Sequence, residues 1–369
     1  MELSYLQQPF TILGNFVKAE PCGSGHINDT YAALYDQAGT PVRYIHQRIN
    51  NRIFADIPAL MENIQRVTDH LQDKLSEAAV LDRSRRALTL LTGPEGRPYF
   101  VDQSGNYWRT YLFIEKASTY DRAETTLQAR EAARAFGEFQ AYLNDLPVEG
   151  FHETIPRFHD TRSRFDTLLA AAEADPKNRA STVRAEIDWF RARENLVDVV
   201  LDGQRAGDVP VRVTHNDTKL NNVMLDDTTM EGVCVIDLDT IMPGSALYDF
   251  GDLIRTATVT GKEDEPETSR IGMDMDCFKA LAEGYLSAMG RCLSEREIDL
   301  LAFSGLLITS EIGMRFLTDY LEGDRYFKVA REGHNLDRCR VQIALAESIE
   351  AQMAAMETLI RETYSSCVS

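Results

Sequence analysis

The sequence predicts an α+β protein with two lobes: a small lobe built on an antiparallel sheet, then a larger, mostly helical lobe. Short apolar runs separated by turn residues fill the first 110 or so residues, and one stretch of helical period interrupts them. After residue 116 the composition favours helices. A length of 369 residues suits two units. We therefore expect one lobe at residues 1–115 and the second at 116–369.

The first lobe is predicted from the alternation of apolar runs with Gly- and Pro-containing turns. Its strands are expected at residues 11–18, 30–35, 43–49, 87–92 and 107–114. Between the third and fourth runs the apolar residues recur at three- and four-residue steps, which is the spacing of one buried helix face. These residues are Ile57, Leu60, Met61, Ile64, Val67 and Leu71. The expected order is three strands, a helix and two strands.

The second lobe is predicted to follow a hinge at residues 113–116. Helix-forming segments are expected at 123–143 and 181–204, and from about 278 to 363, where the last amphipathic stretch starts near 338. Two short β-type runs, 222–225 and 233–237, return between them. Residues 261–267, with several charges and a proline, are the expected exposed loop.

Composition and charge limit the classes of partner. With 44% hydrophobic and 26% charged residues the chain is globular, and a net charge of -19 disfavours nucleic acid and anionic membranes as partners. Six cysteines without a C-x-x-C pair are expected to be free thiols. The start lacks a signal-peptide pattern, and no uninterrupted apolar run reaches membrane-helix length. We expect a cytoplasmic protein without a membrane partner.

The most informative segment is residues 215–222, with the spacing H-x-D-x-K-x-x-N. A phosphoryl-transfer site of the kinase kind needs an Asp for the acceptor hydroxyl, a Lys for phosphate charge and an Asn for Mg²⁺. Asp217, Lys219 and Asn222 supply these residue types, and Asp217 and Lys219 are the expected catalytic pair. The alternative is a polar loop with accidental spacing, but apolar β runs flank this one and an acidic cluster follows it.

Asp237 follows the second β run, a hairpin's length after Asn222. A hairpin returns the carboxylate beside the amide, and such oxygen ligands suit Mg²⁺. Asp239 is either a support or second-metal ligand or a solvated carboxylate. The sequence Asp249-Phe250-Gly251 lies too far along the chain to be the kinase metal-binding triplet, so Asp249 is expected to support the catalytic loop.

The turn at residues 21–28 contains Gly23 and Gly25. Two glycines allow backbone N–H groups to approach phosphate oxygens, although most such turns only reverse the chain. His26, at the tip, either faces solvent or contacts the acceptor.

Several segments together resemble a known family. The order of His215, Asp217, Asn222 and Asp237 is similar to that of the aminoglycoside/choline phosphotransferase superfamily, whose fold is similar to that of protein kinases. A closer resemblance, from about residue 20 to 342, is to the bacterial N-acetylhexosamine 1-kinases. It lies in GHINDTY, WRTYLFIE, RFHDTRSRF, VTHNDTKLNNVMLD, VIDLDTIMPGSALYDFGDLIR and MRFLTDYLEGDRYF.

The resemblance implies that ATP, with Mg²⁺, phosphorylates the anomeric hydroxyl of a sugar such as GlcNAc or GalNAc. It makes the first lobe nucleotide-binding and the second catalytic, with Asp217 as base and Asn222 and Asp237 as Mg²⁺ ligands. The nucleotide-binding residues it implies are Gly23, Gly25, Ile27, Gln47, Phe113, Ile114 and Glu115. The substrate-binding residues it implies are His26, Asn216, Asp217, Arg315 and Tyr326. From the residues alone, Arg315 and Tyr326 are a helix-surface ion-pairing residue and a packed aromatic.

One position departs from the broader superfamily. Gln47 stands on the third strand where a phosphate-pairing Lys is usual, Arg48 points to the other face, and Glu62 is left without that ion-pair partner. The sugar 1-kinases that the chain resembles also lack this Lys, so the groups that hold the α- and β-phosphates stay open. Two other functions are weighed: transfer to an aminoglycoside, choline, homoserine or another sugar, and a catalytically inactive nucleotide-binding module.

Overall fold

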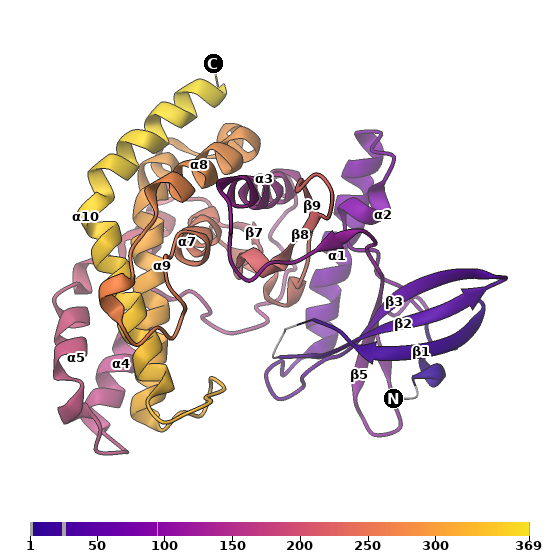
Figure 1. Ribbon diagram of the computed structural model, residues 1–369, viewed down its shortest axis with the longest axis horizontal. Helices are drawn as coiled ribbons and strands as arrows, with labels where there is room; N and C mark the ends of the chain where they lie inside the picture. Colours follow the sequence, from indigo (N-terminus) through magenta and orange to yellow (C-terminus); the bar gives the residue numbers. More distant parts are fainter. Residues whose placement is uncertain (1–2, 24–26, 94, 369) are drawn as a thin grey trace.

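A computed structural model describes residues 3–23, 27–93 and 95–368. The chain forms a lobe with an antiparallel sheet and a larger helical lobe, as predicted, and the helices α7 to α10 gather on the side away from the sheet (Figure 1). The strands are β1 Asn15–Pro21, β2 Asp29–Gln37, β3 Thr40–Arg48, β4 Phe100–Val101, β5 Tyr107–Leu112, β6 Ala117–Ser118, β7 Arg212–Thr214, β8 Val223–Asp226, β9 Gly232–Val235 and β10 Met242–Gly244. The helices are α1 Ile57–Glu77, α2 Arg83–Arg86, α3 Thr126–Tyr142, α4 Thr161–Ala174, α5 Arg184–Arg191, α6 Val199–Ala206, α7 Ala246–Ala257, α8 Met275–Met289, α9 Glu295–Glu322 and α10 His334–Val368.

The sheet of the first lobe has the order β1-β2-β3-β5-β4, with antiparallel neighbours throughout. Its outer face packs on the N-terminal segment and buries Tyr35 and Trp108. On its other side, α1 begins at an Asp56 cap that accepts a hydrogen bond from the Ala59 amide. The apolar face of α1 belongs to the large core of the second lobe rather than to the outer core of the sheet. A continuous apolar core therefore crosses the predicted boundary at residues 115/116.

Two short sheets form the part of the second lobe that lies against the first. Strand β7 pairs with β10, and β8 pairs with both β9 and β6. The loop after β7 and the turn after β9 both come from these sheets, and the hydrogen bond from the Ile236 amide to the Asn222 carbonyl (2.8 Å) joins them. The predicted hairpin is thus present, and it brings residues 222 and 237 to one edge.

Helix α9 is the central helix of the second lobe. Its 18-residue window with a mean hydropathy of 1.5 makes it long and apolar enough to cross a membrane, but 83% of that window is buried inside the protein. The sequence contains no uninterrupted apolar run of that length here, because Ser304, Thr309 and Glu311 divide the run. Helices α4, α7 and α10 cover it, so we interpret α9 as a core helix.

Two predicted elements are wrong. Residues 87–92 form no strand; Leu90 only bridges Tyr111, because the chain is bound to β5 at few points. The predicted helix at 181–204 is divided into α5 and α6. Phe190 and Val197 pack into one core and Val200 into the other, so a straight helix would not bury both faces.

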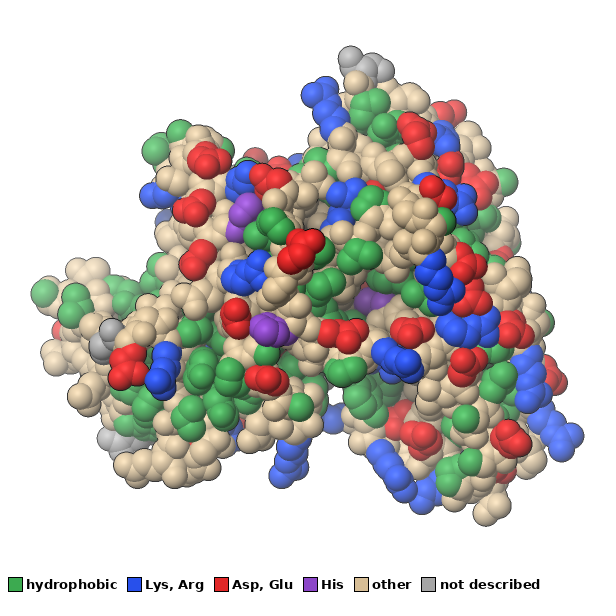
Figure 2. All heavy atoms as spheres, turned by 180° about the vertical axis from the view of Figure 1, so that it is seen from behind, with side chains coloured by type: hydrophobic (Ala, Val, Ile, Leu, Met, Phe, Trp, Pro, Cys, Tyr) green, Lys and Arg blue, Asp and Glu red, His purple; other side chains and the backbone are tan. Residues whose placement is uncertain are grey.

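The surface shows no single basic patch on the face turned away in Figure 1. Lys and Arg side chains are interspersed with Asp and Glu there (Figure 2). The six cysteines are all free, as predicted.

Candidate active site

The loop after β7 is held by its first residue, His215. The Nε2 atom of His215 lies 2.9 Å from the Ile236 carbonyl oxygen, which only accepts, so Nε2 carries the proton. The other ring nitrogen, Nδ1, is then free to accept the Asp217 amide at 3.3 Å. Phe136 and Phe139 of α3 pack edge-on against the ring. His215 therefore joins the loop to the turn after β9 and is not itself placed to react.

Asp249, on α7, supports the same loop, as the sequence analysis expected. Its carboxylate oxygens accept the amides of His215 (3.1 Å) and Asn216 (2.7 Å). Burial raises the pKa of Asp249 to about 6, although the hydrogen bonds from the two amides work in the opposite direction. These bonds hold Asn216 at a φ of 64°, which is uncommon for a residue with a side chain.

The structure gives Asn216 a structural role. Its side-chain amide is buried and donates to the carbonyls of Thr214 and Thr240, both at 3.0 Å, and its oxygen accepts the Thr214 hydroxyl at 2.9 Å. The amide hydrogens of Asn216 are thereby committed within the loop, and its predicted contact with a substrate stays a prediction.

Asp217, Lys219 and Asn222 converge in space. Lys219 Nζ lies 3.0 Å from Asp217 Oδ2, and Asn222 Nδ2 donates to the backbone and side-chain oxygens of Asp217 at 2.7 and 3.2 Å. Burial acts to raise the pKa of Asp217, but the charge and the hydrogen bond of Lys219 outweigh it and hold this pKa below its usual value. Asp217 raises the pKa of Lys219 in turn. The side chain of Asp217 remains 25% exposed, so an ionised carboxylate is accessible to solvent.

Asp237 stands at the end of β9 in a left-handed conformation, with φ 60° and ψ 59°. The residue is exposed, yet desolvation by the surrounding protein and the charges of Asp239 and Asp217 raise its pKa to about 7. Within the described ranges, no group of three His, Cys, Asp or Glu side chains could hold a metal.

The two predicted metal ligands nevertheless fit a hard cation. Asn222 uses its nitrogen toward Asp217, which leaves its oxygen available, and Asp237 carries a carboxylate whose charge the neighbouring acids oppose. Two oxygens from the protein are few for Mg²⁺, which commonly takes the rest from water and substrate phosphates.

Asp239 is neither solvated nor free for a metal. It is 4% exposed, forms an ion pair with Arg109 of β5, and accepts Asn28 Nδ2 at 2.6 Å. Gln47, the residue at the position of the usual lysine, accepts Arg109 Nε at 2.9 Å and donates to the Thr30 hydroxyl at 2.9 Å. Contact of Gln47 with a nucleotide stays a prediction.

The remaining predicted nucleotide-binding residues lie on the turn and at the hinge. Gly23 has a φ of 85°, and nothing lies within 4 Å of where a Cβ would stand; Ile27 is 45% exposed. Gly25 and His26 fall outside the described residues. At the hinge, Ile114 is buried, Phe113 lies under the Arg43 guanidinium, and Glu115 forms an ion pair with the same Arg43.

Arg315 and Tyr326 are brought together. The Arg315 guanidinium lies 5.8 Å from the Tyr326 ring centroid and 5.1 Å from that of Phe158. Tyr326 is 58% exposed, and its ring packs edge-on against that of Phe327, with the two centroids 4.8 Å apart. Arg315 thus lies beside aromatic rings, and the contact of Arg315 and Tyr326 with a substrate stays a prediction.

A buried pair links this cluster to the loop after β7. His159 Nε2 donates to the Asn216 carbonyl at 2.9 Å, and its Nδ1 lies 3.0 Å from Glu311, one turn before Arg315 on α9. Burial acts to lower the pKa of His159, but Glu311 outweighs it and the net pKa is raised. The sequence analysis missed His159, Glu311 and Arg109. Glu311 and Arg109 could have been found, because each is a single charged residue within an apolar run of the sequence.

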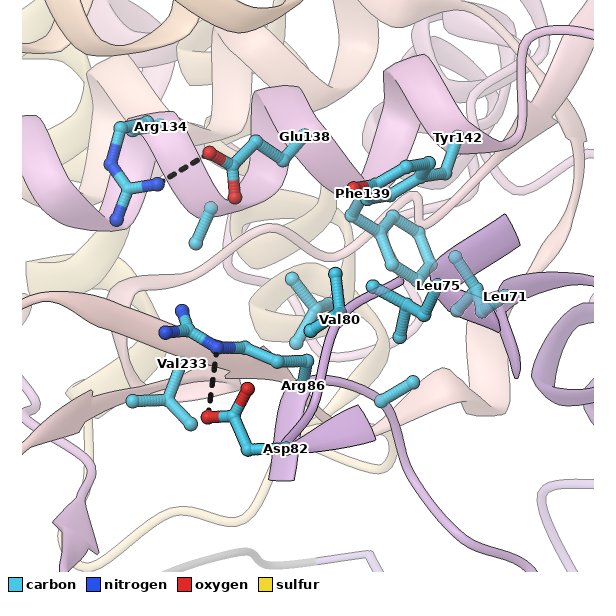
Figure 3. Close-up of a pocket in the computed structure, with 13 residues that line it drawn as sticks. Leu71, Leu75, Val80, Asp82, Arg86, Arg134, Glu138, Phe139, Tyr142 and Val233 are labelled. Carbon is cyan, nitrogen blue, oxygen red and sulfur yellow. Dashed lines mark hydrogen bonds and ion pairs between the residues drawn. The ribbon is translucent and has the colours of Figure 1, made fainter. Parts of the chain in front are cut away.

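Two cavities lie near the loop without containing its reactive groups. One, of about 210 Å³, is lined by Asn216, His159 and Tyr248 behind the loop. The other, of about 260 Å³, lies between α1, α2, α3 and β9 (Figure 3). Its charges are paired, Arg86 with Asp82 and Arg134 with Glu138, and no predicted site residue lines it.

Comparisons with known proteins show which fold and which family the chain shares. The fold is similar to a solved aminoglycoside phosphotransferase from Alicyclobacillus acidocaldarius (TM-score 0.61, 12% identity, 94% of this chain and 93% of that one). It is similar to the GDP complex of aminoglycoside 2'-phosphotransferase-IIIa (TM-score 0.53, 13% identity, 96% and 98% covered) and to a Plasmodium vivax ethanolamine kinase (TM-score 0.51, 12% identity, 87% and 80% covered). Identities this low show the fold alone. A model of the phosphotransferase enzyme family matches residues 18–287. Because that match spans well over half of the chain, this protein belongs to the phosphotransferase enzyme family.

Proposed function

We propose that this phosphotransferase transfers the γ-phosphoryl group of ATP to the anomeric hydroxyl of an N-acetylhexosamine such as GlcNAc or GalNAc, and releases the sugar 1-phosphate. One observation carries the proposal: an ionised Asp217, bonded to Lys219 and Asn222, is joined through Asn216, His159 and Glu311 to the exposed cluster around Arg315. Catalytic groups and acceptor groups thus belong to one connected framework.

In this proposal Asp217 orients the acceptor hydroxyl and accepts its proton. The ion pair with Lys219 and the hydrogen bond from Asn222 fix the carboxylate, but they also lower its basicity. A weak base suffices because phosphoryl transfer passes through a loose transition state, in which positioning contributes more than proton removal. Lys219, at the same carboxylate, offsets charge on the transferred oxygens.

Asn222 and Asp237 would hold Mg²⁺ through their side-chain oxygens. When bound, the cation neutralises charge on the nucleotide phosphates, which the net charge of -19 otherwise repels. ATP would lie under the turn at Gly23 and against the hinge at Phe113 to Glu115.

The charges around Arg315 support a neutral acceptor over a cationic one. Arg164 has a lowered pKa because of burial and because Arg315 is close, so two guanidinium groups lie near each other. The carboxylate of Glu311 is already paired with His159. The Phe158 and Tyr326 rings lie beside the guanidinium of Arg315, where a choline-type ammonium group would meet like charge. An uncharged sugar can hydrogen-bond to Arg315 and stack on Tyr326.

The first test is the position of the phosphate. ³¹P NMR of the product from ATP and GlcNAc should show a phosphate on carbon 1 rather than carbon 6. The methyl glycoside of GlcNAc, which has no anomeric hydroxyl, is the matched control and should not consume ATP. Turnover of choline or an aminoglycoside without turnover of any hexosamine would reject the proposed acceptor in favour of the alternative.

The second test is Asp217→Asn. The variant keeps the size of the side chain but loses the proton acceptor, so ATP binding should be nearly unchanged while turnover falls by about a thousandfold or more. A decrease of less than about tenfold, roughly 1.4 kcal/mol, would contradict the assigned role.

A further inference from the structure

A row of side chains crosses the sheet of the first lobe and ends at the second lobe. Thr30, Gln47 and Arg109 are direct cross-strand neighbours on β2, β3 and β5. Gln47 donates to the Thr30 hydroxyl and accepts Arg109 Nε, each at 2.9 Å, and Arg109 Nη1 is ion-paired with Asp239. Arg109 is 1% exposed, so its charge is fully removed from solvent.

Asp239 connects this row of side chains to the catalytic loop. Its second carboxylate oxygen is held by Asn28, whose own oxygen accepts the Asn50 amide at 3.0 Å, so the first lobe binds Asp239 twice. Asp239 lies in the short 3-10 turn Leu238–Thr240 that directly follows Asp237. In the same turn, the Thr240 hydroxyl donates to the His215 carbonyl at 2.6 Å. The position of Asp237 between the lobes is therefore set from both sides.

The missing strand-3 lysine and the buried arginine are complementary. A lysine at position 47 has donors but no acceptor, so it would remove the acceptor of Arg109 Nε and place a second cation beside a buried guanidinium. The helix acid is also used differently, because Glu62 is 60% exposed and lies 2.9 Å from His152. The cation of this site is thus Arg109 on β5 instead of a lysine on β3, and its counter-ion is Asp239.

We propose that Arg109 is a positioning residue that takes over the structural task of the strand-3 lysine. Held by Gln47, it fixes Asp239 and thereby places the carboxylate of Asp237 for the Mg²⁺–nucleotide complex. The inference rests on the proposed binding of ATP and Mg²⁺ but not on the identity of the acceptor. It makes a counter-intuitive prediction: restoring the lysine of the wider superfamily damages this enzyme.

The test compares substitutions at position 47, which is only half-buried and so spares the fold. The readout is the ratio of the ATP dissociation constants measured by calorimetry without and with Mg²⁺, and it requires no acceptor. Gln47→Met, which loses the hydrogen bonds without adding charge, should lower this ratio by about threefold. Gln47→Lys should lower it by about 30-fold, because a second cation then lies beside the buried guanidinium of Arg109.

The double variant Gln47→Lys/Arg109→Gln separates charge conflict from simple damage. It returns the cation to β3 and the amide to β5, and it should recover at least part of the Mg²⁺ effect that Gln47→Lys alone loses. Arg48→Gln is the control, because it removes a cation from the adjacent position of β3, where the ion pair with Asp29 is about half exposed. Its ratio should stay within about twofold of wild type.

Two results would overturn the inference: a Mg²⁺ effect in Gln47→Lys equal to or larger than that in Gln47→Met, or no recovery in the double variant. Failure of every hexosamine as an acceptor would leave this binding series readable, so the two proposals fail separately.

Discussion

Replacing Asp249 by Asn should separate activity from stability. The carboxylate accepts two backbone amides, at 2.7 and 3.1 Å, from the residues directly before Asp217. Asn keeps one acceptor oxygen, but its NH₂ group then faces the second amide donor. One charge-assisted hydrogen bond is lost and the other becomes neutral, which together cost about 3 kcal/mol. If the lost free energy is the energy that holds Asp217 in its reactive position, kcat falls by about 100-fold.

The same substitution removes a buried charge. Burial raises the pKa of Asp249 to about 6 from 3.8, so the ionised carboxyl costs about 3 kcal/mol of folding free energy at neutral pH relative to the unfolded chain. Asn does not pay this cost. The two effects nearly cancel, and the free energy of unfolding at pH 7.5 should change by less than about 1.5 kcal/mol.

The pH dependence of the unfolding free energy tests whether the buried carboxylate destabilises the fold. The folded wild-type protein binds more protons than the unfolded chain between about pH 4 and 6, so this carboxyl destabilises the fold as the pH rises through that window. From pH 7 to pH 4, wild type should therefore gain up to about 3 kcal/mol relative to Asp249→Asn.

The assay combines denaturant unfolding at both pH values with steady-state turnover at saturating ATP and acceptor. Asp274→Ala is the control. It removes a carboxylate that caps α8 and accepts the Cys277 amide, so it should cost about 1 kcal/mol of stability and leave kcat unchanged. A kcat of Asp249→Asn within threefold of wild type would refute the positioning role. A large loss of stability without any pH dependence would refute the burial argument.

Three further outcomes are expected. Burial lowers the pKa of His46 to about 4, so the unfolded chain takes up a proton at this histidine before the folded protein does. The free energy of unfolding of the wild type should therefore fall by up to about 3 kcal/mol between pH 6.5 and pH 4. In the same denaturant titration, the free energy of unfolding of His46→Gln should fall by less. Gly284→Ala should lower the unfolding free energy by about 2 kcal/mol or more, because the new Cβ would clash with the Arg130 carbonyl oxygen where α8 crosses α3. An unchanged melting temperature would contradict this close crossing. EDTA should abolish turnover without shifting the melting temperature of the nucleotide-free protein, because the described residues hold no three-ligand metal cluster; a shift would indicate a structural metal.

The convergence of polar residues in the loop after β7 was predictable because these residues are close in sequence. Asp217, Lys219 and Asn222 lie within a few residues of one another in the sequence. The short hairpin that follows returns the chain beside them, which fixes the position of Asp237. The same short range made α1 and the first three strands predictable, since each buries a regular face. The division of the predicted helix at 181–204 was not predictable, because the break depends on two separate cores that exist only in the folded chain.

Partner choice is what the sequence left open. Arg109 in a strand and Glu311 in a core helix were each visible as a lone charge in an apolar run, and a buried charge requires a partner. The chain offers 58 acids and 39 Lys plus Arg, however, so the requirement did not identify which one. Asp239 lies 130 residues from Arg109, and Glu311 lies 152 residues from His159. Only the fold brings such distant residues together.

Gln47 shows how a position taken alone can mislead. Considered by itself, the absence of a lysine suggests an inactive module, because a cation of the superfamily site is missing. Considered with its cross-strand neighbour, the same position supplies an acceptor to Arg109, and the adjacent strand supplies a cation. A module released from catalysis has no physical reason to keep a fully buried ion pair, which costs desolvation and is seldom the most stable way to fill a core. The buried pair of Arg109 and Asp239, directly behind Asp237, is therefore an argument for a working site.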